Sequence, residues 1–136
     1  MMMENGFDRL RFDSVSLTEE SPEQCRIEVA FSFAGRTIQK SLNGSTDEAS
    51  RLKTAAVATL EAVKEAVENQ FDCSLADLDH VNALGKNLIA VLVDIVYEGK
   101  DIQVFGSCPI TGSELDAAVK AALNATNRFV ELSCRR

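Results

Sequence analysis

Residues 27–39 read IEVAFSFAGRTIQ, and residues 91–103 read VLVDIVYEGKDIQ. Gly35 and Gly99, which align in these two stretches, lie 64 positions apart (99 − 35). The same spacing relates Phe7-Asp8 to Phe71-Asp72, and a spacing of 63 relates residues 58–62 to residues 121–125. A long repeat that occurs only twice is unlike the many short repeats of a solenoid. The sequence therefore predicts two copies of one supersecondary unit, which pack with pseudo-twofold symmetry and cover each other's apolar faces.

Each copy carries three stretches with strand character and then one with helix character. Alternating or β-branched apolar residues predict the strands, and apolar residues at three- and four-residue spacing predict the helices. The predicted strands are 9–17, with a bulge near Asp13-Ser14, 25–33, 36–42, 75–83, 88–97 and 100–105; one helix follows Ser45 or Thr46 and ends near Asn69, and the other follows Ser113. We therefore expect an α+β fold, with two helices on one face of an antiparallel sheet, formed by one domain of residues 1–136 with repeats at 8–70 and 71–131.

The predicted strand at residues 88–97 contains more apolar residues than a strand needs in a sheet with one solvent-exposed face. This pattern predicts a central strand covered on both faces. Together with the flat surfaces that alanine-rich helices leave, it favours a homodimer with an isologous interface.

Composition limits the kinds of partner. The 136-residue chain has a formal net charge of −7, which argues against nucleic acid and anionic membranes as partners. It contains no apolar run long enough to span a membrane and no secretory h-region. Its four cysteines share no Cys-x-x-Cys spacing, so we expect a cytoplasmic protein with reduced thiols.

Catalytic residues are sparse in this sequence. His80 is the single histidine, so we expect it to be structural and expect no metal site or cofactor. Cys108 precedes Pro109 close to a predicted helix start, where a thiolate is favoured, and Asp77 and Asp79 share one face of a strand. These residues leave a small enzyme open as an alternative, although no general base stands at an identifiable spacing.

The loops before the helices are better candidates for binding. Gly44-Ser45-Thr46, Gly106-Ser107 and Gly112-Ser113 precede predicted helix N-termini, whose free N–H groups attract a carboxylate or phosphate. Helix capping alone explains the same residues.

Residues 99–102, a glycine-containing loop and the alanine-rich stretch 117–125 together resemble the C-terminal regulatory domain of 2-isopropylmalate synthase. The strand 78–83 resembles the one that opens the second unit of that domain, which is built of two βββα units. The resemblance covers about residues 8–130. The catalytic barrel of the synthase is absent from this chain, so the resemblance implies a non-catalytic regulatory module, with a separate synthase as a possible partner.

The family's domain binds leucine at the interface between two regulatory domains, so the resemblance implies a small amino acid, possibly leucine, as ligand. The positions that match its binding site are Asn82, Ala83, Gly85, Gly106, Ser107, Gly112 and Ser113. The loop before the last helix is longer than in the family and uncharged. A dimerisation scaffold that keeps the fold without the ligand is the alternative.

Overall fold

The computed structural model describes residues 9–134, and in this range the order βββα occurs twice. The first unit contains β1 (Arg11–Glu19), β2 (Gln24–Phe33), β3 (Arg36–Ser45) and α1 (Glu48–Ala66); the second contains β4 (Asp72–Ala83), β5 (Lys86–Tyr97), β6 (Lys100–Pro109) and α2 (Glu114–Cys134). The predicted α+β fold of two βββα repeats is therefore confirmed.

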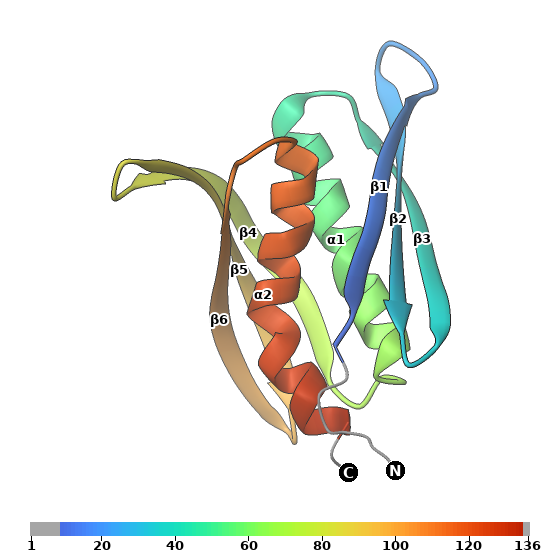
Figure 1. The fold of residues 1–136 in the computed structure, drawn as a ribbon, viewed down its shortest axis with the longest axis vertical. Coiled ribbons are helices and arrows are strands. Elements are labelled where there is room, and N and C mark those ends of the chain that lie inside the picture. The colour runs from blue at the N-terminus through green and yellow to red at the C-terminus, as the bar shows by residue number, and fades with distance from the viewer. Residues whose placement is uncertain (1–8, 135–136) are drawn as a thin grey trace.

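The strands form two antiparallel sheets instead of the single sheet that we expected. We call them sheet A, with strand order β1-β2-β3, and sheet B, with order β4-β5-β6. Figure 1 shows the two helices side by side between the sheets. Each helix contacts its own sheet, and it also contacts the first strand of the other unit: α1 lies against β4 and α2 against β1. Each helix thus covers the last two strands of its own sheet and the first strand of the other sheet.

Equivalent turns mark the two units. Ala34-Gly35 joins β2 to β3 with both residues at positive φ, and Glu98-Gly99 joins β5 to β6 in the same conformation, 64 positions later. Two-residue turns of this kind match the twist of the paired strands and favour glycine at the second position. The register of β1 on β2 shifts between Phe12 and Ser14, which confirms the predicted bulge. A corresponding shift occurs in β4.

Small side chains allow the helices to fit between the sheets. The helix residues of the core are largely alanines, and Thr59 and Thr126 are buried because their hydroxyls donate to the carbonyl oxygens of Ala55 and Ala122, one turn earlier. The inner faces of the sheets supply the larger apolar groups of the core, among them Ile27, Val29, Phe31, Ile89, Val91, Val93 and Ile95, all 0–1% exposed.

Several local predictions were wrong. Asp47, and neither Ser45 nor Thr46, caps α1: its carboxylate accepts from the backbone N–H of Ser50 at 2.9 Å, because β3 continues through Ser45. The helix ends at Ala66 instead of Asn69, since Glu68 and Asn69 adopt positive φ. One strand and one turn also differ from the prediction. β6 continues to Pro109 where a loop was predicted from residue 106, and the turn between β4 and β5 is Leu84-Gly85 alone instead of residues 84–87.

Candidate functional site

The outer faces of the two sheets differ in chemistry although the units share one register. In sheet A, Glu28 pairs with Ser41, and both are exposed. In sheet B, the equivalent residues 64 positions later are Leu92 and Phe105, which also pair. Phe105 is 78% exposed. Because the same fold tolerates a polar pair in sheet A, folding alone does not require the apolar pair in sheet B.

The apolar residues of this outer face lie mainly on β5, and β4 and β6 contribute one residue each. Exposed or half-buried apolar side chains of this outer face are Val81, Leu88, Ala90, Leu92, Val96 and Phe105. We call this set the sheet B patch. The prediction that β5 is covered on both faces is therefore wrong for the single chain: Val91, Val93 and Ile95 are buried beneath α2, whereas Leu88, Ala90 and Leu92 are only half-buried. Apolar side chains gathered on an exposed face are typical of binding sites and interfaces.

A shallow hollow of about 190 Å³ lies within the patch. Val81, Ala90, Leu92 and Phe105 supply its apolar lining, and Asp77 and Asp79 are also among the lining residues. One oxygen of Asp77 accepts from the N–H of Leu78 at 2.8 Å, and one oxygen of Asp79 accepts from the N–H of His80 at 2.9 Å. A carboxylate has several acceptor positions, so both groups can also accept from a cationic ligand.

The predicted ligand-binding residues fall in three separate places. Asn82, Ala83 and Gly85 belong to the β4–β5 hairpin, whose tip residue Leu84 is fully exposed. Gly106 and Ser107 lie inside β6, and Gly112 and Ser113 precede α2. The N–H of Ile110 donates to the carbonyl of Asn87 at 2.9 Å, which ties the end of β6 to the hairpin. These residues do not line one common cavity among those found in residues 9–134.

Two of the predicted residues have a structural role. Gly106 is buried, and a Cβ built on it would lie 2.2 Å from the carbonyl oxygen of Ala121, so the glycine is needed where β6 crosses α2. The hydroxyl of Ser113 accepts from the N–H groups of Leu115 and Asp116, at 3.1 and 3.3 Å. Ser113 thus caps α2, and these N–H groups are already partnered.

Two of the cysteines, Cys73 and Cys108, have hydrogen-bond partners within the fold. Cys108 pairs with buried Ile89, and its thiol donates to the carbonyl of Pro109 at 3.4 Å. Cys73 is buried, and desolvation raises the pKa of its thiol to about 12. A thiol with this pKa is neutral at physiological pH and is a poor nucleophile.

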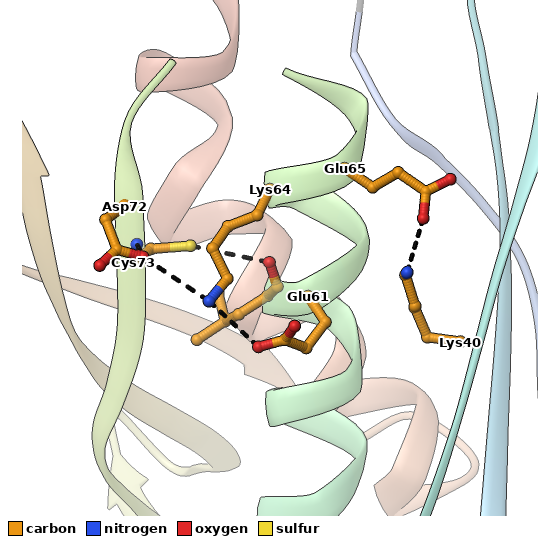
Figure 2. A network of polar contacts seen from close by, with 7 residues as sticks. Lys40, Glu61, Lys64, Glu65, Asp72 and Cys73 are labelled. Carbon is orange, nitrogen blue, oxygen red and sulfur yellow. Dashed lines mark hydrogen bonds and ion pairs between the residues drawn. The ribbon is translucent and has the colours of Figure 1, made fainter. Parts of the chain in front are cut away.

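Figure 2 shows the polar contacts around Cys73. Lys64 bridges α1 and β4, because its ammonium lies 3.1 Å from Glu61 and 3.6 Å from Asp72. Burial by itself would lower the pKa of Lys64. The hydrogen bond and charge of Glu61, together with the charge of Asp72, outweigh burial, so the net effect is a raised pKa. On the other side of α1, Lys40 of β3 pairs with Glu65. These ion pairs fasten α1 to both sheets and leave the sheet B patch untouched.

The sequence of this chain matches no protein-family model and no curated protein. The resemblance to the synthase regulatory domain therefore stays a prediction. Within residues 9–134, neither helix combines the length and the apolar character needed to cross a membrane.

Local sequence patterns do not predict the outer face of sheet B as a site, and they indicate Asp77 and Asp79 only as a possible acid–base pair. A signal was available: at the aligned positions of the repeat, Gln24, Arg26, Glu28 and Ser41 are replaced by Leu88, Ala90, Leu92 and Phe105. Comparison of the two repeats would have identified the asymmetry before the fold was known.

Proposed function

We propose that this chain is a non-catalytic module that forms a homodimer through the outer face of sheet B and binds a small apolar amino acid, such as leucine, at that face. The observation that carries the proposal is the contrast between the two sheets. Sheet A presents polar side chains to solvent, and sheet B presents the apolar patch at equivalent positions. A second copy of the chain would remove this apolar surface from water.

The order of residues along β5 supports a second copy as the occupant. From Lys86 to Asp94 the outward-facing residues are Lys86, Leu88, Ala90, Leu92 and Asp94, in that order, and Val96 follows them. A twofold axis that lies between two facing sheets, perpendicular to β5 and midway between the two copies of Ala90, would place Lys86 opposite Asp94 of the partner subunit. Leu88 would then face Leu92 of the partner subunit. The strand is thus complementary to itself in both charge and apolar character, as an isologous interface requires.

The hollow supports an apolar amino acid as ligand. Its volume of about 190 Å³ is below the ~300–1,000 Å³ of sites for drug-sized molecules, which suits a single small side chain. Asp77 and Asp79, which also line it, offer carboxylate oxygens to an α-ammonium group. The partner subunit would close the open side of the hollow. The resemblance to the synthase domain adds leucine as the first ligand to test and a separate synthase as the regulated partner.

Sedimentation velocity tests the dimer. Leu92→Glu places in sheet B the residue that sheet A carries at Glu28. We expect the wild-type chain to sediment as a dimer and Leu92→Glu to weaken the dimer at least 100-fold, because a charge would be buried in the apolar interface. The control is Glu28→Gln on sheet A, which should leave the dimer intact. A wild-type monomer at 100 µM would refute this part of the proposal.

Thermal unfolding tests the ligand. A ligand present at 100 times its dissociation constant stabilises the native state by about 2.7 kcal/mol, so millimolar leucine, isoleucine or valine should raise the melting temperature. Asp77→Asn combined with Asp79→Asn should remove the shift, whereas the dimer should persist. If the wild-type protein is a dimer and none of the common amino acids changes its melting temperature, the result would support a dimerisation scaffold that binds no ligand.

A further inference from the structure

Three side chains with metal-ligating atoms converge where the two helices begin. Glu48 is the first residue of α1, Glu114 is the first residue of α2, and His80 projects from β4. The Nε2 atom of His80 lies 2.8 Å from a carboxylate oxygen of Glu114. One ligand atom from each of the three residues falls within 4.8 Å of the other two. The cluster therefore joins both units of the fold at one point.

Helix capping does not explain why the two glutamates meet. Asp47 accepts from the N–H of Ser50 in α1, and Ser113 accepts from the N–H groups of the first turn of α2. The side chains of Glu48 and Glu114 instead turn toward each other, so that one carboxylate oxygen of each lies within 4.8 Å of the other and of a ring nitrogen of His80. Two carboxylates this close favour a cation between them.

The imidazole decides which cation suits the cluster. Mg²⁺ and Ca²⁺ prefer oxygen ligands only, whereas one imidazole nitrogen with two carboxylates suits divalent first-row transition ions such as Mn²⁺, Co²⁺ and Zn²⁺. Bonds of ~2.0–2.2 Å hold ligand atoms within roughly 4.2 Å of each other. The observed 4.8 Å limit therefore requires only a small adjustment of side chains that are all at least partly exposed.

We propose that Glu48, His80 and Glu114 form a binding site for a divalent first-row transition ion. Three protein ligands leave coordination positions for water or an exogenous ligand. The ion would join the starts of α1 and α2 to β4. The site lies apart from the sheet B patch, because Val81 and Asp79 point outward from β4 while His80 between them pairs with buried Ile89 and points toward the helices. Ion binding is thus independent of the proposed dimer and ligand.

The single histidine of the chain makes the test specific. In the untagged full-length protein, the imidazole signals in NMR spectra report on His80 alone. We expect Mn²⁺ to broaden these signals at substoichiometric concentration, and Zn²⁺ titrated in a calorimeter to bind with one ion per chain. Both His80→Asn and Glu114→Gln should weaken Zn²⁺ binding at least tenfold.

Two variants serve as controls. Asp116→Asn removes another carboxylate from the first turn of α2, and Cys108→Ala removes a partly exposed thiol; both should bind Zn²⁺ as the wild type does. Melting without added metal verifies that each variant is folded. Binding that survives in folded His80→Asn, or wild-type protein that shows neither Mn²⁺ broadening nor Zn²⁺ heat below 1 mM added metal, would overturn the proposal.

Discussion

Gly106→Ala tests the contact that positions β6 on α2. A Cβ at residue 106 would lie 2.2 Å from the carbonyl oxygen of Ala121, 2.6 Å from the backbone nitrogen of Ala125 and 2.7 Å from its Cβ. These are backbone atoms or the first side-chain atom of a buried helix, so they cannot rotate away. The distance between strand and helix must grow by roughly 1 Å to reach ordinary contact, and close-packed interiors resist such a change.

The expected loss of stability follows from this clash. Inserting one carbon into a well-packed core costs about 1–3 kcal/mol, and replacing glycine returns roughly 0.4–1 kcal/mol through the unfolded chain. We expect Gly106→Ala to lower the free energy of unfolding by about 1–2 kcal/mol net. For a chain of this size, each kcal/mol lowers the melting temperature by roughly 3–5 °C.

Urea unfolding followed by circular dichroism measures the effect. Gly112→Ala is the matched control, because a Cβ at that residue meets nothing within 4 Å; its unfolding free energy should stay within ~0.5 kcal/mol of wild type. If Gly106→Ala is as stable as Gly112→Ala, the close approach of β6 and α2 is wrong. Unchanged stability combined with lost amino-acid binding would instead restore the predicted role of Gly106 in a ligand site.

Three further predictions concern the core and the cap. Phe129→Ala should cost about 3–5 kcal/mol of unfolding free energy, measured by urea unfolding, because Phe129 is 8% exposed and its ring packs against Phe71 and Tyr97 at 5.9 and 5.5 Å; a loss under 1 kcal/mol would contradict this packing. Burial raises the pKa of the Cys73 thiol from 9.0 to about 12, so the contribution of the neutral thiol to stability is fully present below pH 9 and is lost as pH rises toward 12. Between pH 8 and 10.5 the free energy of unfolding of the wild type should fall by about 2 kcal/mol more than that of Cys73→Ala. Parallel pH profiles of the two proteins would refute this. The hydrogen bond from the Ser45 hydroxyl, and then that from the Ser50 N–H, lowers the pKa of Asp47, so the ionised carboxylate stabilises the fold above the ordinary aspartate pKa and this contribution is lost as pH falls through the lowered value. Asp47→Ala should lower the melting temperature at pH 7 and should reduce the fall of melting temperature in acid. A melting temperature equal to that of wild type at pH 7 would exclude this cap.

Local patterns predicted the elements well because neighbouring residues determine them. The alternation of Ile27, Val29 and Phe31 predicts a strand with one buried face, and the turn glycines Gly35 and Gly99 mark two hairpins at the spacing of the repeat. The element ends were harder to predict. The local sequence predicts that Gly106 and Pro109 lie in a loop. In the structure β6 continues through both residues, because it pairs with β5 there and packs closely against α2 at Gly106.

The candidate sites depended on information that no short stretch contains. His80 reads as an isolated histidine, because Glu48 and Glu114 are 32 and 34 positions away in sequence and meet it only when both helices start at the same end of the sandwich. The outer face of sheet B likewise appears only when β4, β5 and β6 are aligned in register.

The sequence by itself determined the repeated unit, its strands and helices and the polarity of each strand face, since backbone geometry and side-chain alternation are local properties. Only the tertiary structure decided that the strands divide into two sheets with the helices between them. It also decided which helix starts meet and which apolar side chains stay exposed. These outcomes depend on contacts between distant segments, where close packing selects among arrangements that the local pattern allows equally.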